Sequence, residues 1–490
     1  MTDTCEYVFD PDVENGDGRP GSSVDSVWDC PHPTYVDTDY CVFHLARESR
    51  EILGVTDVEV RDFFVRTVEE TEDGESCRFI GATFGDTVVE KDELGENAEV
   101  IDLRNTEFDG KFELNCDVVE ADLIVDYSEL ESFSAPNVVF EGDVSFRGCR
   151  FEGRVNLDGA RFEGDVTFEK TSFSLNAEFS DAVFKGEVDF RRSVCSGVQT
   201  TFKNAEFHSD VLMKSANFDK VDFTGADFRS DADFSGTVFD EETKFQYVSF
   251  EGGAEFGNAD FNDNSTFRGV SFSGRTNFKD VSFQGWVSFL DVEFGRDVSF
   301  ESVWFKSEIN MVAESENNAV IDFTGSRMGK ASFEIEPYKP VILDFTNARV
   351  GNVRLKMEGR VNNPFDNVRF IETKFNGFRF SEYADYLAEK DYVIHDSVVK
   401  KDEELSLPRL EKTYRLAADG AKSDSPKISS NFAKKESKYR RERFRREGQS
   451  LNYYMNLVGE YGVYIFALVV VLVLAVVGFV YSDEIVGLLP

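Results

Sequence analysis

Residues 250–294 decide the fold, and they read FEGGAEFGNADFNDNSTFRGVSFSGRTNFKDVSFQGWVSFLDVEF. Phe stands at the first position of this stretch and then returns after steps that alternate between six and five residues. Two such steps make a period of 11 residues, which is neither the period of about 3.6 of a helix nor the period of about 2 of a simple strand. The pattern predicts a small structural unit that is copied many times along the chain.

The alternation extends over residues 140–305, with a slip between residues 195 and 228 after which it recovers. Two residues before each Phe the side chain is small or β-branched, as at Ala254, Val270 and Val281. Because residues two apart in an extended chain point to the same side, we expect Phe and its small neighbour to face inward together. The sequence therefore predicts a solenoid of very short extended sides separated by tight corners.

The longer steps often contain glycine two residues after Phe, and this glycine is expected to form the corner. Examples are Gly186, Gly252, Gly274 and Gly285. Since glycine adopts positive φ angles at low cost, we expect these positions to supply the left-handed conformation of a tight turn.

These units, such as Val-Asp-Phe-Thr-Gly-Ala-Asp-Phe at 221–228, resemble the pentapeptide-repeat family in its Phe-centred, 11-periodic, haloarchaeal variety. The resemblance implies an all-β fold, a right-handed quadrilateral β-helix with stacked Phe in its interior. It covers residues 140–310 strongly, where we expect about eight coils, and more weakly the degenerate coils of 71–139 and 311–380. The open ends of such a solenoid need a cap or a homodimer contact.

The N-terminal segment, residues 1–70, contains a candidate zinc site formed by Cys5, Cys30, Cys41 and His44. Three thiolates and one imidazole complete a closed tetrahedral site, which would fold a small segment that lacks a core of its own. The resemblance to the haloarchaeal branch implies a similar Cys and His segment before the repeats. The alternative is a loop-rich cap with buried thiols and a surface histidine. The seven cysteines of the chain do not resemble a secreted disulfide framework.

The chain carries 93 Asp and Glu against 53 Lys and Arg, a net charge of −40, and 49 Phe in 490 residues. Such acidity argues against a nucleic-acid partner, because phosphate binding needs clustered basic residues. Two interpretations remain open. One is adaptation of the surface to a salt-rich cytoplasm, and the other is imitation of the phosphate rows of DNA.

Residues 381–450 are expected to form helices and a basic neck, with 13 Lys and Arg against 5 Asp and Glu between Arg409 and Arg446. Residues 461–482 carry no charge over 22 positions and predict a transmembrane helix about 33 Å long, followed by a short tail, 483–490. The basic residues before this stretch predict a single-pass protein of the cell membrane with its N-terminal body in the cytoplasm. The neck would then contact anionic lipid, and the helix the lipid bilayer.

Catalysis is not expected, because the four histidines are scattered and no Gly-rich phosphate loop is present. The leading hypothesis is a non-enzymatic, membrane-anchored cytosolic scaffold for an unknown protein partner. The resemblance implies one alternative, since some family members mimic duplex DNA and inhibit topoisomerases. A further alternative is a regulatory subunit of a membrane channel or transporter.

Overall fold

The computed structural model describes residues 4–11, 26–91, 93–94, 97–336, 338–357, 363–395, 405–450, 452–453 and 455–457. The chain divides into two compact units, Met1–Asp344 with Val353–Asn362 and Phe345–Asn352 with Asn363–Pro490. The first unit holds the repeats and the N-terminal cysteines, and the second holds the C-terminal helices.

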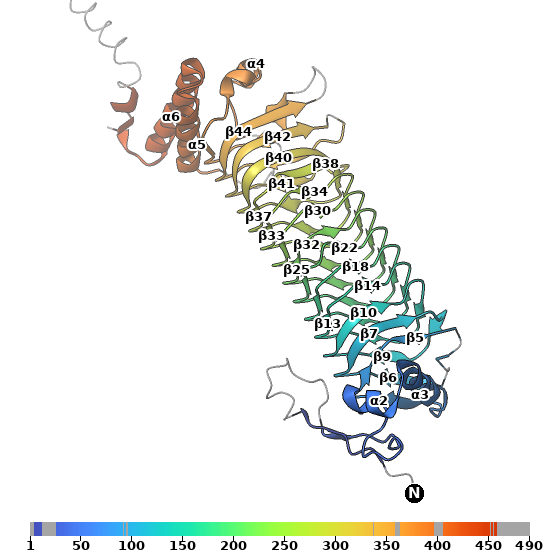
Figure 1. Ribbon diagram of the computed structural model, residues 1–490. Helices are drawn as coiled ribbons and strands as arrows, with labels where there is room; N and C mark the ends of the chain where they lie inside the picture. The colour runs from blue at the N-terminus through green and yellow to red at the C-terminus, as the bar shows by residue number, and fades with distance from the viewer. Residues whose placement is uncertain are drawn as a thin grey trace, which may run out of the picture. The chain divides into compact units, whose positions relative to one another are not determined.

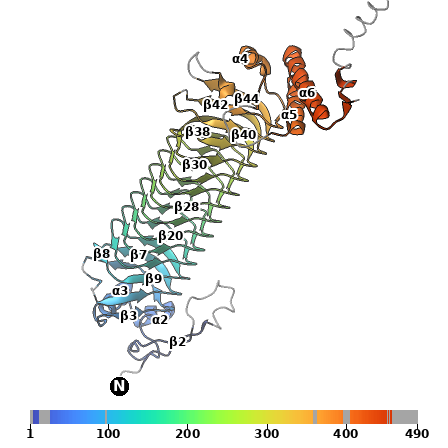
Figure 2. The same ribbon diagram turned by 180° about the vertical axis from the view of Figure 1, so that it is seen from behind.

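The first unit is a right-handed β-solenoid whose sides are mostly strands of two residues (Figure 1). One parallel sheet receives one strand from every turn, so its thirteen strands in this unit correspond to thirteen turns. Figure 2 shows β9, β20 and β28 of this sheet following one another. The thirteen strands are β3 (Glu75–Arg78), β6 (Ala98–Asp102), β9 (Asp122–Ile124), β12 (Val144–Ser145), β16 (Val166–Thr167), β20 (Val188–Asp189), β24 (Val211–Leu212), β28 (Ala232–Asp233), β32 (Ala254–Glu255), β36 (Thr276–Asn277), β39 (Val298–Ser299), β41 (Val320–Asp322) and β43 (Ile342–Asp344).

Each regular turn adds three further strands, which gives the solenoid four sides. The second side consists of β13 (Arg150–Phe151), β17 (Ser172–Phe173), β21 (Val194–Cys195), β25 (Asn217–Phe218), β29 (Val238–Phe239), β33 (Asp260–Phe261) and β37 (Ser282–Phe283). The third consists of β14 (Val155–Asn156), β18 (Ala177–Glu178), β22 (Thr200–Thr201), β26 (Val221–Asp222), β30 (Thr243–Lys244) and β34 (Ser265–Thr266). The fourth consists of β11 (Val139–Phe140), β15 (Arg161–Phe162), β19 (Val183–Phe184), β23 (Glu206–Phe207), β27 (Asp227–Phe228), β31 (Ser249–Phe250) and β35 (Ser271–Phe272).

Toward both ends of this unit the corners straighten and sides merge into longer strands, where the parallel register shifts at a bulge. These strands are β7 (Glu107–Leu114), β10 (Glu129–Ser134), β38 (Val287–Phe294), β40 (Trp304–Glu314) and β42 (Arg327–Ile335).

Stacked phenylalanine rings fill the interior, as the sequence predicts. Phe256, for example, is fully buried and lies between Phe234 and Phe278, with ring centroids 4.9 and 4.7 Å away and nearly parallel planes. Burying one such ring contributes roughly 1.5–3 kcal/mol. Rings from neighbouring sides meet edge to face, as Phe256 and Phe245 do at 5.6 Å, so each ring has both contact geometries that aromatic pairs favour.

The slip in the Phe spacing is an insertion followed by a deletion. Strand partners in the one-per-turn sheet lie 22 residues apart, as Val144 and Val166 do, but 23 apart at Val188 and Val211 and 21 apart at Val211 and Ala232. The extra residue lies in the corner between β21 and β22, and the missing one in the corner between β25 and β26. Both changes fall in corners, so the inward residues keep their register.

The expectation for the corner glycines is wrong. Gly186, Gly252, Gly274 and Gly285 are all described, and none of them has a positive φ. They are needed for space: a Cβ at Gly274 would lie 2.0 Å from the carbonyl oxygen of Gly252 in the preceding turn.

The left-handed corners lie elsewhere, two residues after the Phe of every second side. They take varied residues, such as Lys170 with φ 61° and Asn258 with φ 61°. The backbone N–H of the residue that follows bonds back to the Phe carbonyl, as Thr171 does to Phe168 at 3.1 Å. This geometry is that of a type II turn, which requires φ above zero at its third residue.

Two helices that the sequence analysis did not predict, α2 (Arg47–Leu53) and α3 (Asp57–Glu69), belong to the N-terminal segment. A capping box between Thr56 and Glu59 starts α3. The buried ring of Phe64 on α3 lies 4.9 Å from Phe79 in the first turn of the solenoid. The helix therefore covers the N-terminal end of the Phe stack and keeps it from water.

The second unit contains a pair of packed helices, α5 (Leu407–Ala421) and α6 (Pro426–Arg446), together with the short helix α4 (Ala384–Glu389). On α5, Glu411 accepts hydrogen bonds from Arg440 and Arg443 of α6 at 2.9 and 3.0 Å. Ser425 caps α6, and Pro426 occupies the first turn, where its missing N–H costs nothing.

No helix among the described residues is both long and apolar enough to cross a membrane. The longest of them, α6, has 21 residues, but Lys and Arg side chains occur along its length. This finding overturns the transmembrane helix in our expected fold class and the single-pass membrane localisation that depended on it. The stretch 461–482, where we placed that helix, lies outside the described residues.

The steric role of the corner glycines can be tested with two alanine substitutions. We expect Gly274→Ala to lower the free energy of unfolding by about 1–3 kcal/mol, because the new methyl group overlaps the backbone of the turn below. Gly329→Ala is the matched control, since a Cβ there meets no atom within 4 Å. Chemical denaturation followed by circular dichroism measures both; equal stability of the two variants would contradict the steric explanation.

Candidate metal centre

The backbone of the N-terminal segment brings two distant cysteines together. Strands β1 (Val8–Phe9) and β2 (Trp28–Asp29) pair antiparallel, and the N–H groups of Cys5 and Cys30 continue the ladder to the carbonyls of His32 and Tyr7, each at 3.0 Å. The other two residues share one tight turn, in which the N–H of His44 donates to the carbonyl of Cys41 at 3.0 Å.

The four predicted residues meet in space, with one ligand atom of each of Cys5, Cys30, Cys41 and His44 within 4.8 Å of the others. The Sγ atoms of Cys30 and Cys41 lie 3.8 Å apart. The Nδ1 atom of His44 is 3.7 Å from the sulfur of Cys5 and 3.2 Å from that of Cys41. Tetrahedral metal–sulfur bonds of about 2.3 Å place two sulfurs about 3.8 Å apart. The arrangement can therefore hold a metal ion.

Surrounding groups orient the ligands. The Nε2 atom of His44 lies 3.0 Å from the carbonyl of Ile80 and donates to it, which leaves Nδ1 as the acceptor that faces the sulfurs. The backbone N–H of Cys41 donates to the sulfur of Cys5 at 3.1 Å, and the ring of Tyr7 stacks on the imidazole at 3.8 Å. Hydrogen bonds of this kind fix the tautomer of a metal-binding histidine and raise its basicity.

The thiols are buried and share protons. Cys5, Cys30 and Cys41 are 7%, 3% and 1% exposed. The hydrogen bond with Cys30 and the neighbouring His44 lower the pKa of Cys41 to about 4, while the bond with Cys41 and burial raise the pKa of Cys30. The pKa of Cys41 is thus the lowest of the three thiols, and a bound cation would displace the protons that its neighbours keep.

His32, which lies close by in the sequence, is not a ligand. Its Nε2 atom lies 2.9 Å from the carbonyl of Arg78 in β3, and its ring stacks on Phe79 at 5.4 Å. Both imidazoles of the segment therefore bond to carbonyls in or next to the first turn of the solenoid. The cysteine cluster thus lies where the N-terminal segment contacts that turn.

The remaining histidines and cysteines do not join a second cluster among the described residues. His208 lies beside Glu206 at 3.2 Å, and His395 contacts the hydroxyl of Tyr414 at 2.8 Å. The Cys149 thiol is fully buried and donates to the carbonyl of Val125 at 3.1 Å. The sequence predicted the four clustered residues but not Tyr7 and Ile80, because only the fold brings these two to the site.

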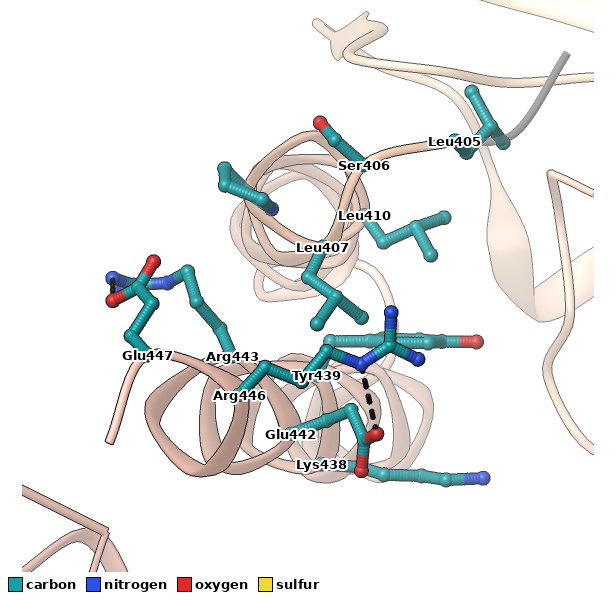
Figure 3. A pocket seen from close by; sticks show the side chains of 11 residues that line it. Leu405, Ser406, Leu407, Leu410, Lys438, Tyr439, Glu442, Arg443, Arg446 and Glu447 are labelled. Carbon is teal, nitrogen blue, oxygen red and sulfur yellow. Dashed lines mark hydrogen bonds and ion pairs between the residues drawn. The ribbon is translucent and has the colours of Figure 1, made fainter. Parts of the chain in front are cut away.

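The second unit contains a groove of about 680 Å³ between the first turn of α5 and the last turns of α6 (Figure 3). Leu407, Leu410 and Tyr439 form its apolar part, and no histidine or cysteine occurs among its lining residues. Two charged pairs border it, Arg446 with Glu442 at 3.2 Å and Arg443 with Glu447 at 3.4 Å. These four charged side chains at the rim of the groove are thus paired with one another within the unit.

Part of the coil stack matches a known family. Residues 131–172, 146–194, 223–271 and 256–304 match the family of pentapeptide repeats (9 copies). These matched coils are similar to pentapeptide repeats. The matched pentapeptide repeats lie in the tract where the Phe period is most regular. No curated protein matches the chain, and no solved structure matches it.

Metal content tests the cluster. We expect the purified protein to carry one metal ion per chain, measured by inductively coupled plasma mass spectrometry, and Cys41→Ser to lose it because the site then has three ligands. A chelator should lower the melting temperature of the wild-type protein but not that of the variant.

Cys116→Ser is the control, since Cys116 is buried in the solenoid and should leave the metal content unchanged. Equal metal content in Cys41→Ser and the wild type would contradict the assignment of the site.

Proposed function

We propose that the protein is a non-enzymatic scaffold that binds a partner protein through one side of its pentapeptide-repeat solenoid. We name this side the Val194 face. It comprises the outward residues of the second side, the first residue of β40 and the corners that follow these strands: Arg150, Ser172, Val194, Asn217, Val238, Asp260, Ser282 and Trp304, with corner residues 152–154, 174–176, 196–199, 219–220, 240–242, 262–264 and 284–286.

The observation that carries the proposal is the position of the exposed apolar side chains. All residues from 140 to 310 are described, and six large hydrophobic side chains in this range are exposed. Five of them lie on the Val194 face: Leu175, Val194, Val198, Trp286 and Trp304. The sixth, Tyr247, lies at a corner on another side. Tryptophan and aliphatic side chains gathered on one surface are typical of protein-binding sites.

The solenoid suits this role because its backbone is rigid. Every turn between the two ends is hydrogen-bonded to the turns on both sides, and the rings inside leave no room for repacking. A surface that is already ordered loses little conformational entropy when a partner binds. The proposed face would thus act as a preformed platform.

For the N-terminal cluster we propose zinc. Three sulfurs and one imidazole nitrogen in a closed tetrahedral arrangement are a donor set that zinc favours, and no ligand position is left for a substrate. Its role would be structural, because the site lies between the N-terminal segment and the first turn. It would help to cover a strand edge that is otherwise open to pairing.

The DNA-mimic alternative receives less support from the charges of the coils. Residues 141–304 carry 30 Asp and Glu but also 17 Lys and Arg, a net charge of −13 over about seven turns. Basic side chains pair with acidic ones across turns, as Arg147 does with Glu169 at 2.8 Å and Lys203 with Asp222 at 3.3 Å. Duplex DNA carries almost three charges over the rise of about 4.8 Å of one turn, with no interleaved cations. The channel-subunit alternative depended on the membrane helix and is not retained.

Site-specific photo-crosslinking in the native host tests the interaction face. With p-benzoylphenylalanine in place of Trp304, we expect a crosslinked partner band, because Trp304 is 47% exposed at the proposed face. The same group in place of Tyr247, 59% exposed on another side, is the matched control and should give no such band. Equal crosslinking from both positions, or from neither, would contradict a binding role for the Val194 face.

A supercoiling assay separates the scaffold from the DNA mimic. We expect no inhibition of a topoisomerase at stoichiometric ratios, because the cations on the coils interrupt the acidic surface. Inhibition that is lost when the exposed carboxylates of the coils are replaced by amides would favour the mimic instead.

A further inference from the structure

We propose that the Val194 face between residues 150 and 220, together with the corner that precedes it in each turn, binds an acidic protein segment that carries aliphatic side chains. This inference rests on the proposed scaffold function and names the chemistry of the partner. The surface is defined by five exposed or half-exposed cations at its leading corner, Arg147, Lys170, Arg191, Arg192 and Lys214, and by three exposed aliphatic residues, Leu175, Val194 and Val198. We call it the basic-aliphatic patch.

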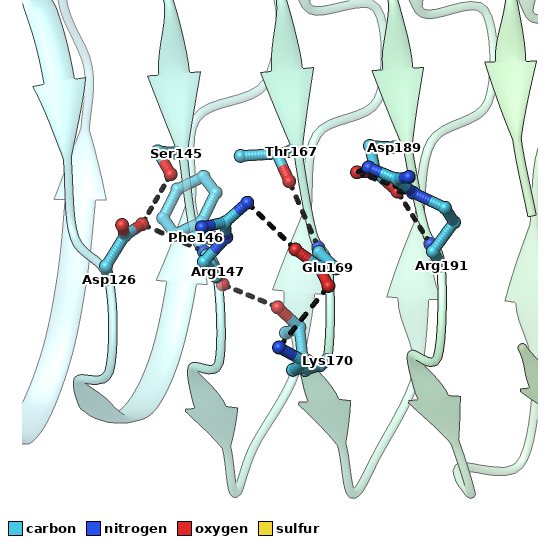
Figure 4. A network of polar contacts seen from close by, with 10 residues as sticks. Asp126, Ser145, Phe146, Arg147, Thr167, Glu169, Lys170, Asp189 and Arg191 are labelled. Carbon is cyan, nitrogen blue, oxygen red and sulfur yellow. Dashed lines mark hydrogen bonds and ion pairs between the residues drawn. The ribbon is translucent and has the colours of Figure 1, made fainter. Parts of the chain in front are cut away.

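The charges at the leading corner are layered, with anions inside and cations outside (Figure 4). The Glu169 side chain is only 12% exposed and is contacted by Arg147 at 2.8 Å and Lys170 at 3.4 Å, whose side chains are 43% and 44% exposed. Asp189, 9% exposed, is held by Arg191, which is 45% exposed. A partner approaching this corner therefore meets positive charge first.

Two further cations extend the row without a partner of their own. Backbone hydrogen bonds from Lys170 to Arg191 and from Arg192 to Lys214, at 2.9 and 3.2 Å, place these residues in successive turns. Arg192 and Lys214 are exposed, and neither forms an ion pair with any residue that the structure describes. Neighbouring turns lie about 4.8 Å apart. An extended segment that lies across the turns can therefore contact the charges of Arg192 and Lys214 one after the other.

The aliphatic part of the patch coincides with the register slip. The extra residue lies in the corner 196–199, and Val198 in that corner is 76% exposed, the most exposed large hydrophobic residue between 140 and 310. A Cβ at Gly197 would lie 2.0 Å from the carbonyl oxygen of Leu175, so this corner sits directly on the preceding one. Leu175 and Val194 are 48% and 42% exposed. A departure from the repeat that presents an apolar side chain to solvent is what a binding site would require.

The local charge identifies the class of partner. Residues 190–220 carry five Lys and Arg against three Asp and Glu, in a chain whose net charge is −40. Complementary charge favours an acidic partner, and the three aliphatic residues favour one with apolar side chains between its carboxylates.

Nucleic acid fits this surface less well. Beyond the patch, the next two turns of the same face carry Asp240, Glu241, Glu242, Asp260 and Asp263. A long polyanion would be repelled there, whereas a short protein segment can end before it.

Fluorescence anisotropy with the full-length protein tests the inference. The probe is a fluorescein-labelled octapeptide, Glu-Glu-Leu-Asp-Val-Glu-Glu-Ser. We expect saturable binding that weakens at least about tenfold in the double variant Arg192→Glu and Lys214→Glu, since two attractive contacts become repulsive. We also expect Val198→Ser to weaken binding several-fold.

The matched control is Arg268→Glu. Arg268 is exposed and follows Phe267 as Arg191 follows Phe190, but it lies at a corner on another side; this variant should bind the probe as the wild type does. Circular dichroism verifies that all variants are folded. A probe with serine in place of its aliphatic residues should bind more weakly, and a probe with lysine in place of its acidic residues should not bind.

Absence of probe binding, or equal binding by the double variant, would overturn the inference. So would an eight-nucleotide oligothymidylate that binds the patch as tightly as the peptide, because phosphate recognition would then explain the cations. The scaffold proposal fails separately: if the probe does not bind but photo-crosslinking at Trp304 still captures a partner, only the chemistry inferred for the patch is wrong.

Discussion

The inward side chain of each side, usually a phenylalanine ring, lies over that of the preceding turn, and this stacking constrains the rest of the solenoid. Phe239 and Phe261, 22 residues apart, stack at 4.6 Å; such contacts leave no space for a ring that is out of register. Changes of length are therefore confined to the corners, where the insertion near residue 198 and the compensating deletion near residue 220 are found. The outward side chains are released from packing and can vary. Binding chemistry can therefore change on the surface while the interior stays constant.

The sequence contained the period, the inward residues and the four cysteine and histidine ligands, because each of these is a local pattern of residue types. The sequence alone did not reveal why glycine occurs at the corners. A Cβ at Gly274 meets an oxygen of Gly252, a residue of the preceding turn, and such a contact becomes visible only when the turns are stacked. Helix α3 was missed because its buried residues, Val60, Phe64, Val65 and Val68, lie among acidic ones in a segment that composition marks as polar. The approach of Cys5 to Cys30 likewise depends on β1 and β2, two strands too short to be predicted.

At the two ends of the coil stack in the first unit, the outermost strands have a neighbouring turn on one side only, so their other edge is open to pairing. At the N-terminal end, the buried Arg50 guanidinium donates to the carbonyls of Val42, Phe43 and Thr83 at 2.8, 3.1 and 2.7 Å, and the Thr83 N–H donates to the carbonyl of Phe43 at 3.0 Å. These bonds occupy backbone groups of Val42, Phe43 and Thr83 that could otherwise form hydrogen bonds with a strand of another chain. The cysteine cluster lies in the same region, and His44 of the cluster contacts the first turn through its hydrogen bond to the carbonyl of Ile80.

Because the turns stack in parallel at a constant spacing, the number of turns sets the distance between two points on the same side of the solenoid. Val194 and Trp304 are separated by five steps of the same strand column, which corresponds to about 24 Å at a spacing of about 4.8 Å per turn. Duplication or loss of one 22-residue coil between them would change this distance by a single fixed increment and would alter neither end. The length of a partner that touches both ends is therefore encoded in the number of coils, and evolution can adjust it one coil at a time.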